Sequence, residues 1–289
     1  MPTRLLFWLV LYPLSIIPFT ILYGFFYFFY FIINYLIGYR KEIINKNLKL
    51  SFPEKSNREL RRIRHQYYHH LTQIAAEMLK MLTISKKKLG QRYQCPHPEL
   101  VNQYFEQGKS VILISSHYNN WEWMVLSLDS LFKHHGVGVG KPNSNKVFEK
   151  LINRARTRYG TEVVFADTVR DTFERYETTH QPVTYMMLCD QSPHNSKKCY
   201  VTDFLNQKSG IIFGAEYFAK KYDLPVVYYQ VIKDKKGYYH IDLELITDRP
   251  TETEPGEITK TYVKLLENTI RNHPPYWLWS HKRWKFKFD

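Results

Sequence analysis

Cysteine is scarce in this chain of 289 residues. Cys95, Cys189 and Cys199 make up the whole complement, and no two of them form a CxxC pair. An odd number of cysteines without close pairs argues against a disulfide framework and against a zinc site. We therefore expect reduced thiols, and a soluble part that faces a reducing compartment.

Charge is absent from one long segment near the start of the chain. From Leu5 to Gly38 there is no charged residue and no histidine. As one straight helix this run would be roughly 50 Å long, whereas a bilayer core needs about 20 residues. Pro13 and Pro18 interrupt it. The run therefore predicts a membrane anchor, either one span after a short interfacial piece or a re-entrant helical hairpin.

The charges that flank the run predict its orientation. Arg4 precedes it, and Arg40, Lys41, Lys46 and Lys49 follow it. An excess of positive charge after the run is typical of a body on the cytoplasmic side. We expect residues 1–40 to form the anchor and residues 41–289 to form one catalytic domain.

The whole chain also has an excess of positive charge, with 41 Lys and Arg against 27 Asp and Glu and a net charge of +14. Such a chain favours anionic partners, which include nucleic acid, anionic lipid and acidic proteins. No zinc finger, RNP-type strand or basic heptad region is found, so nucleic acid is not expected. The aromatic fraction of 16% suits a membrane interface, although codon bias in an AT-rich genome explains it equally well.

Residues 41–110 are expected to be mainly helical, and Ser56 and Glu59 form a capping-box pattern. Beyond residue 110, short β-rich runs alternate with helical ones, which predicts an α/β fold with a mostly parallel sheet between helices. The expected strands cover residues 111–115, 161–166, 183–189, 225–232 and 238–246. One expected helix begins at Trp121, and three others cover residues 169–177, 210–222 and 258–272.

His117 and Glu122 are the strongest candidates for chemistry. His117 directly follows the buried strand 111–115, and Glu122 lies in the first turn of the next helix. Ligands of α/β proteins bind outside the carboxyl ends of the strands, which is where this histidine falls. A histidine can take a proton from a hydroxyl at neutral pH, and a carboxylate on its other ring nitrogen fixes the tautomer. On spacing alone, a structural pair explains the pattern better than a functional one.

Other patterns are weaker. GVGVGKPNS (136–144) lacks the spacing of a phosphate-binding P-loop, and the absence of a G-x-S-x-G elbow argues against a serine hydrolase. The pairs His69-His70 and His134-His135 lack the spacing of metal ligands, so we expect them at the surface and expect no metal site.

Four ordered blocks resemble one family. SSHYNNWE (115–122) is similar to the HxxxxD/E motif of the lysophospholipid acyltransferase superfamily, and closest to its late lipid A acyltransferases, the lauroyl- and myristoyl-transferases. Residues 141–160, 187–227 and 272–285 resemble that branch's second block, third block and C-terminal HPxxYxWxHxRxK signature. Lys141 stands where the family usually has Arg, and FLN at Phe204 stands where it usually has FFG.

The resemblance implies a glycerolipid-acyltransferase-like fold and transfer of a fatty acyl group to a lipid hydroxyl. His117 would deprotonate the acceptor, Glu122 would orient His117, and the donor would be an acyl carrier protein thioester, without cofactor, metal or covalent acyl-enzyme. The implied substrate-binding residues are Lys141, Asn143, Arg154, Arg156, Asp190, Gln191, His281 and Arg283.

The implied acceptor is a lipid A precursor at the cytoplasmic face of a bacterial inner membrane. A lysophospholipid or an amino-acid lipid stays open as the acceptor. So does a catalytically silent membrane protein that binds lipid or carrier protein.

Overall fold

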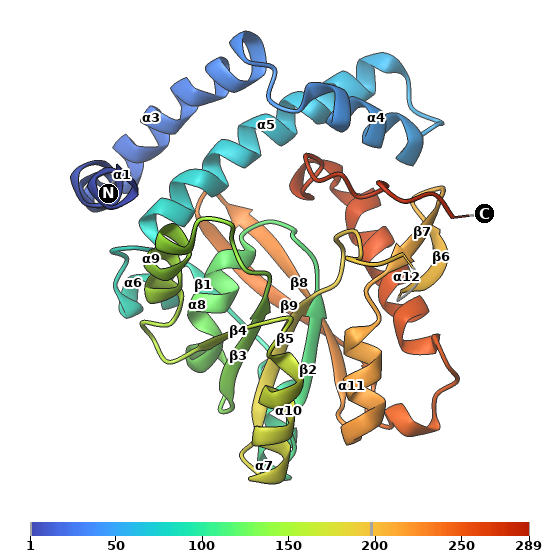
Figure 1. Cartoon of the computed structure of the whole chain (residues 1–289). Coiled ribbons are helices and arrows are strands. Elements are labelled where there is room, and N and C mark those ends of the chain that lie inside the picture. Colours follow the sequence, from blue (N-terminus) through green and yellow to red (C-terminus); the bar gives the residue numbers. More distant parts are fainter. Residues whose placement is uncertain (1, 197–198, 289) are drawn as a thin grey trace.

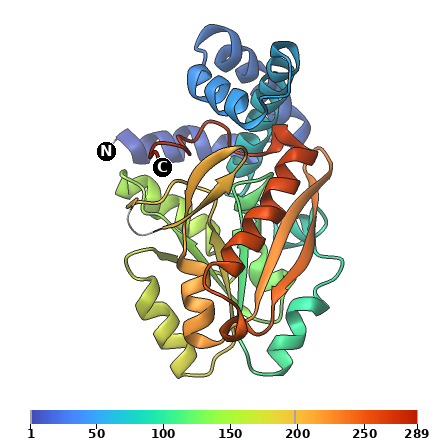
Figure 2. The ribbon, with the colours of Figure 1, turned by 90° about the vertical axis from the view of Figure 1, so that its right-hand side faces the viewer.

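The computed structural model describes residues 2–196 and 199–288. Its centre is a seven-stranded sheet in the order β1-β9-β8-β2-β5-β3-β4. All neighbours in this sheet are parallel except β8 and β9, which form an antiparallel pair. Figures 1 and 2 show helices on both faces of the sheet. The expected fold class, an α/β fold with a mostly parallel sheet between helices, is confirmed.

Most of the expected elements are also found. The strands are β1 Tyr93–Gln94, β2 Val111–Ser115, β3 His135–Gly140, β4 Glu162–Phe165, β5 Val183–Leu188, β8 Val226–Lys235 and β9 Tyr238–Thr247. The helices that pack on this sheet or precede it are α4 Lys41–Ser51, α5 Asn57–Lys80, α6 Lys86–Gly90, α7 Glu99–Glu106, α8 Trp121–Leu131, α9 Lys146–Arg156, α10 Val169–Thr178, α11 Gly214–Tyr222 and α12 Glu257–Asn272. The capping box of α5 is confirmed, since Ser56 and Glu59 bond each other's backbone N–H groups.

Strand β2 shows how the sheet builds two cores. Successive side chains of a strand point to opposite faces. Ile112 and Ile114 join the core that contains α10, α11, α12 and the C-terminal tail, whereas Val111 and Leu113 join the core beneath α8. A strand that is buried on both faces explains why the sequence VILIS is apolar throughout.

The prediction of a helix over residues 210–222 was wrong for residues 210–213. Strand β7, Gln207–Ile211, pairs with β6, Tyr200–Phe204, in an antiparallel hairpin, and α11 begins only at Gly214. Leu205 and Asn206 form the two-residue turn, both with positive φ, as tight hairpins require. At Gly210 in β7, an added Cβ atom would lie 2.6 Å from Cys199 Sγ. The absence of a side chain therefore lets β7 pack closely against the chain at Cys199.

Strand β3 was not expected, because its sequence HGVGVG is rich in glycine, which is uncommon in strands. Packing explains its composition. A Cβ atom on Gly136 would lie 2.4 Å from Cβ of Leu128 and 2.8 Å from Oδ1 of Asp129. Only glycine lets β3 approach α8 this closely.

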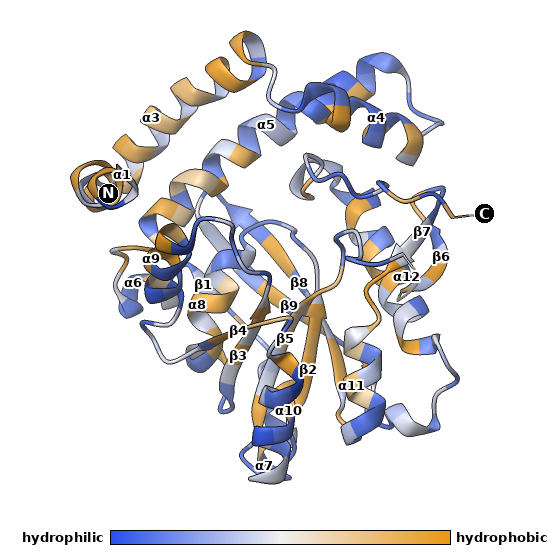
Figure 3. Cartoon of the chain, viewed as in Figure 1, coloured by the Kyte–Doolittle hydropathy of each residue, from blue (hydrophilic) through white to orange (hydrophobic). Residues whose placement is uncertain are grey.

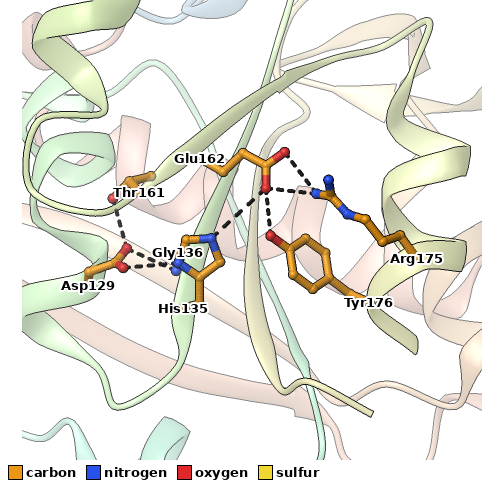
Figure 4. A network of polar contacts seen from close by, with 7 residues as sticks. All are labelled: Asp129, His135, Gly136, Thr161, Glu162, Arg175 and Tyr176. Atoms are coloured by element: carbon orange, nitrogen blue, oxygen red, sulfur yellow. Dashed lines mark hydrogen bonds and ion pairs between the residues drawn. The ribbon is translucent and has the colours of Figure 1, made fainter. Parts of the chain in front are cut away.

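The expectation that the paired histidines lie at the surface was wrong for His70 and His134, which are buried. His135 is half-buried in a polar network at the start of β3 (Figure 4). Its Nδ1 atom lies 3.1 Å from Asp129 Oδ2, and its Nε2 atom lies 4.0 Å from Glu162 Oε2. The hydrogen bond with Asp129 raises the pKa of His135. This network ties α8, β3, β4 and α10 together at the amino end of the strands.

The N-terminal segment forms a separate layer above the carboxyl ends of the parallel strands (Figure 1). It consists of α1 Pro2–Leu6, the π-helix η1 Phe7–Leu11, α2 Tyr12–Ile16, α3 Phe19–Phe31 and the π-helix η2 Ile32–Leu36. Figure 3 shows that α1 and α3 are mostly hydrophobic, whereas α4 and the first half of α5 are largely hydrophilic. Among the described residues, Phe19–Leu36 is the one helical stretch long and apolar enough to cross a membrane, and only 17% of it is buried.

Candidate active site

The segment between β2 and α8 carries His117 at the carboxyl end of a central strand. Asn119 adopts a left-handed conformation, with φ of 51°, and its Nδ2 atom donates to the Val231 carbonyl at 2.6 Å. Asn120 caps α8 by accepting a hydrogen bond from the Trp123 N–H group. The backbone of Tyr118 forms a bridge with Trp277 in the C-terminal tail. These contacts fix the segment directly after His117.

Asp190 is the carboxylate that contacts His117. Its Oδ1 atom lies 2.7 Å from His117 Nδ1, and its Oδ2 atom accepts a hydrogen bond from Trp277 Nε1 at 2.8 Å. Burial by itself would raise the pKa of Asp190, but the neighbouring His117 and its hydrogen bonds outweigh burial and lower this pKa. The carboxylate is therefore held ionised beside the imidazole.

The other ring nitrogen of His117 faces Gln191. Gln191 Nε2 lies 3.1 Å from His117 Nε2. An ionised Asp190 can only accept a hydrogen bond, so the N–H group is assigned to Nδ1 and a lone pair is left on Nε2. Because an amide NH₂ group donates, it can occupy this lone pair. This is the protonation state that a general base requires.

Glu122 does not take the place that the sequence analysis expected for it. Instead of orienting His117, its two oxygens accept hydrogen bonds from Arg156 Nε at 2.8 Å and Arg156 Nη2 at 2.5 Å. Burial by itself would lower the pKa of Arg156, and the charge of Glu122 outweighs it and raises this pKa. Glu122 is nearly fully buried and already paired through both oxygens, so the structure gives it a contact with α9 rather than with the histidine.

The remaining predicted residues fall into two groups. Lys141, Asn143 and Arg154 are exposed, on the loop after β3 and on α9. His281 and Arg283 lie on the tail. His281 Nε2 accepts the Ser192 N–H group at 3.2 Å. Arg283 is buried, donates to the Gly210 carbonyl at 2.8 Å and lies over the Phe204 ring.

Burial also explains the titration of the two tail residues. It lowers the pKa of His281 to about 4 and that of Arg283 to about 10. His281 is thus neutral at physiological pH, and it faces the same loop, residues 190–192, that contacts His117.

A pocket of about 240 Å³ opens between α5, Trp121 and the tail. The Trp121 ring lies 5.3 Å from the His117 ring, centroid to centroid. The rest of the pocket wall is mostly apolar, and its polar members are Arg40, Ser280 and His281. The apolar members are Tyr39, Leu71, Ile74, Ala75, Met78 and Leu278. An apolar pocket of this kind, beside the His117 ring, suits a hydrocarbon chain.

A larger polar hollow of about 390 Å³ lies elsewhere, and its lining includes Lys109, Asp223 and Asp248. Lys109 precedes β2 and Asp223 precedes β8, so this hollow is at the amino ends of the parallel strands. Ligands in such sheets bind at the opposite ends. We therefore place the site at His117 and not in the larger hollow.

Glu77 is a buried carboxylate that sequence reasoning missed. Tyr23 donates to its Oε1 atom at 2.7 Å, and Asn120 and Tyr239 each donate to its Oε2 atom at 2.7 Å. Burial raises the pKa of Glu77, and these three hydrogen bonds oppose that shift. The carboxylate thereby joins α3, α5, β9 and the segment that carries His117. A single glutamate within an amphipathic helix gives no sequence signal of such a role.

Comparison with known proteins identifies the family of the chain. The model of the bacterial lipid A biosynthesis acyltransferase family matches residues 1–286. The lipid A biosynthesis lauroyltransferase of Escherichia coli (strain K12) is 22% identical over 253 residues, which cover 85% of this chain and 79% of that protein. Because the family model covers nearly the whole chain, the protein belongs to the bacterial lipid A biosynthesis acyltransferase family and is an acyltransferase.

Proposed function

We propose that this acyltransferase moves a fatty acyl chain from an acyl carrier protein thioester to a hydroxyl of a lipid A precursor, at the cytoplasmic face of the inner membrane. The observation that carries the proposal is the His117–Asp190 pair beside an apolar pocket. Membership of the lipid A family supports the acceptor class. The apolar N-terminal helices support a membrane location.

In the proposed reaction, His117 Nε2 removes the proton from the acceptor hydroxyl as its oxygen attacks the thioester carbonyl carbon. The C–S bond then breaks, and the imidazolium returns the proton to the departing thiolate. The ionised Asp190 stabilises the imidazolium, and Trp277 holds Asp190 in place. This sequence needs no metal, no cofactor and no covalent acyl-enzyme.

Glu122 and Arg156 have a different proposed role. Their bidentate pair joins the first turn of α8 to the last turn of α9, so it holds α9 beside the site. Lys146, Lys150 and Arg154 follow one another at four-residue spacing along α9, all exposed. This basic stripe, together with Lys141 and Asn143, would contact the phosphate groups of the acceptor.

The excess of positive charge suits an acidic carrier protein as the donor. A net charge of +14 would accelerate the encounter with such a partner electrostatically, and this acceleration would fall with added salt. The positive net charge and the resemblance of the motif blocks therefore both support an acyl carrier protein as the donor.

The test is acyl transfer by the purified protein in lipid vesicles, with acyl carrier protein thioesters as donors and mass spectrometry of the lipids as the readout. We expect a new acyl chain on a lipid A precursor, and a loss of turnover of about 10²–10⁴-fold for His117→Ala with folding intact. Acylation of lysophosphatidate alone would refute the proposed acceptor. An unchanged rate for His117→Ala would refute the proposed base. Binding without turnover in the wild type would favour a silent lipid-binding protein.

A further inference from the structure

The apolar N-terminal segment exposes a hydrophobic surface. Most of the large apolar side chains that are exposed among the described residues lie between Leu5 and Tyr39. The most exposed are Leu36 at 80%, Leu9 at 69% and Ile37 at 67%. Arg40, Lys41, Lys46 and Lys49 follow this surface and are all exposed. Apolar side chains bordered by bases match the chemistry of a lipid leaflet with anionic headgroups.

One polar stripe of α5 holds α3 and η2 along most of their length. His65, His69, Gln73 and Glu77 recur every fourth residue on α5. Three members of the stripe contact the apolar segment. His65 Nδ1 lies 3.0 Å from Asn34 Nδ2, the His69 ring packs edge-on against the rings of Tyr27 and Tyr30, and Glu77 accepts from Tyr23.

The break between α2 and α3 is also attached to the body. Lys80 Nζ donates to the carbonyls of Ser15 at 2.7 Å and Ile17 at 2.8 Å. These carbonyls are left free because Pro18 ends the helical hydrogen-bonding pattern there. A charged side chain of the body therefore stabilises the middle of the apolar segment.

The body in turn holds α5 in place. Ile63, Tyr67 and Ile74 of α5 are buried in the two cores, and Tyr67 donates to Ser280 Oγ at 2.9 Å. If α3 crossed a bilayer in this arrangement, the ionisable stripe of α5 would lie at the depth of the hydrocarbon. Ionisable side chains at that depth are energetically costly and rare.

The first helix points to the same conclusion. Asn145, the N-cap of α9, donates to Thr3 Oγ1 at 3.3 Å, and Figure 1 shows the N-terminus beside α9. A spanning helix would place Thr3 and α9 on opposite sides of the membrane. The contact instead places the start of the chain on the same side as the catalytic body.

We infer that the N-terminal segment is a monotopic anchor, which lies in one leaflet with α3 roughly parallel to the membrane plane. This inference rests on the membrane attachment in the proposed function. It identifies the partner of the exposed face as the headgroup and upper acyl region of an anionic leaflet. Access to the site would then be from that leaflet, because the pocket beside Trp121 is lined by α5, directly beneath the anchor.

The test measures the depth of spin labels in vesicles that contain anionic lipid. Ile21, Phe28 and Tyr35 are suitable positions, because they are seven residues apart and are 61%, 63% and 63% exposed. Each is replaced by a labelled cysteine in a variant whose three native cysteines are changed to alanine. Tyr217, an exposed aromatic on α11, provides the control label on the body.

A monotopic anchor predicts similar depths for the three labels, within about 5 Å, and an aqueous Tyr217 label. A spanning helix predicts a steady change of about 21 Å between Ile21 and Tyr35, at 1.5 Å per residue, and would overturn the inference. A protein that does not sediment with the vesicles would overturn both the inference and the proposed membrane attachment. Acyl transfer in detergent tests the reaction separately, so the two failures are distinguishable.

Discussion

Asp190 Oδ1 lies 2.7 Å from His117 Nδ1, although the two residues are 73 positions apart in the sequence. The nearer carboxylate in the sequence, Glu122, is occupied by Arg156. The acidic residue of the HxxxxE pattern, Glu122, is thus not the partner of the histidine, which is Asp190. Changes at Asp190 should therefore affect turnover, and changes at Glu122 should affect stability.

The first prediction concerns Asp190. Asp190→Asn keeps the size of the side chain but removes the charge that stabilises the imidazolium and fixes the tautomer. We expect kcat to fall by about 10²–10⁴-fold, with KM nearly unchanged, because the lost interaction belongs to the transition state. Steady-state kinetics with an acyl carrier protein donor measures the change. A variant that retains more than half of the wild-type kcat would contradict the assignment.

The second prediction separates the Glu122–Arg156 pair from the chemistry. Arg156→Leu leaves the nearly fully buried Glu122 carboxylate unpaired, so it should lower the free energy of unfolding by about 3 kcal/mol. Glu122→Gln leaves the Arg156 guanidinium, which is partly exposed to solvent, so it should lower the free energy of unfolding by less. The double variant should lose less than the sum of the two. Thermal unfolding in detergent checks this, with Arg154→Leu as the matched control, because Arg154 is exposed on the same helix. Strictly additive losses would show that the pair is not coupled.

The outcome at this site shows what the sequence could and could not predict. The strand VILIS followed by a histidine placed His117 at the correct end of the sheet, because burial on both faces leaves a plain apolar pattern. The partner of His117 depended on which strand lies beside β2. That neighbour is β5, which is distant in the sequence, and no local pattern encodes this choice.

The elements that were missed have a similar physical cause. Strand β3 and the β6–β7 hairpin are held by close backbone packing at Gly136 and Gly210, and glycine has little strand propensity of its own. Glu77 and Lys80 were missed because their bonding partners, Tyr23 and the carbonyls near Pro18, belong to the N-terminal layer. The sequence indicated only that this layer is apolar.

The third prediction concerns pH and His281. The pKa of His281 is about 4 in the folded protein, against an ordinary value of 6.5 in the unfolded chain. Between these values the unfolded state binds more protons, so stability rises with pH across this window and is lost as the pH falls from 6.5 toward 4. His281→Gln removes the titrating ring and can still accept from Ser192. We expect its melting temperature to depend less on pH in this window than that of the wild type.

Exposed His97 provides the control for that measurement, since His97→Gln changes a ring that is 79% exposed. Other buried histidines, His70 among them, keep part of the pH dependence in both proteins. Equal slopes for the wild type and His281→Gln would show that the histidine of the tail does not contribute.

The last prediction tests whether Glu77 connects the N-terminal layer to the catalytic segment. Tyr23→Phe removes one donor from a carboxylate that is fully buried, which should cost about 1–3 kcal/mol. Because Asn120 binds the other oxygen of the same carboxylate, the loss should also loosen the segment around His117. Hydrogen exchange of residues 117–123 should therefore become faster, while exchange in α12 stays at its wild-type rate. Tyr27→Phe is the matched control, since Tyr27 lies one turn further along α3 and its side chain is 48% exposed. Faster exchange throughout the chain would indicate general destabilisation, and unchanged exchange in residues 117–123 would show that the N-terminal layer and the site are not connected through Glu77.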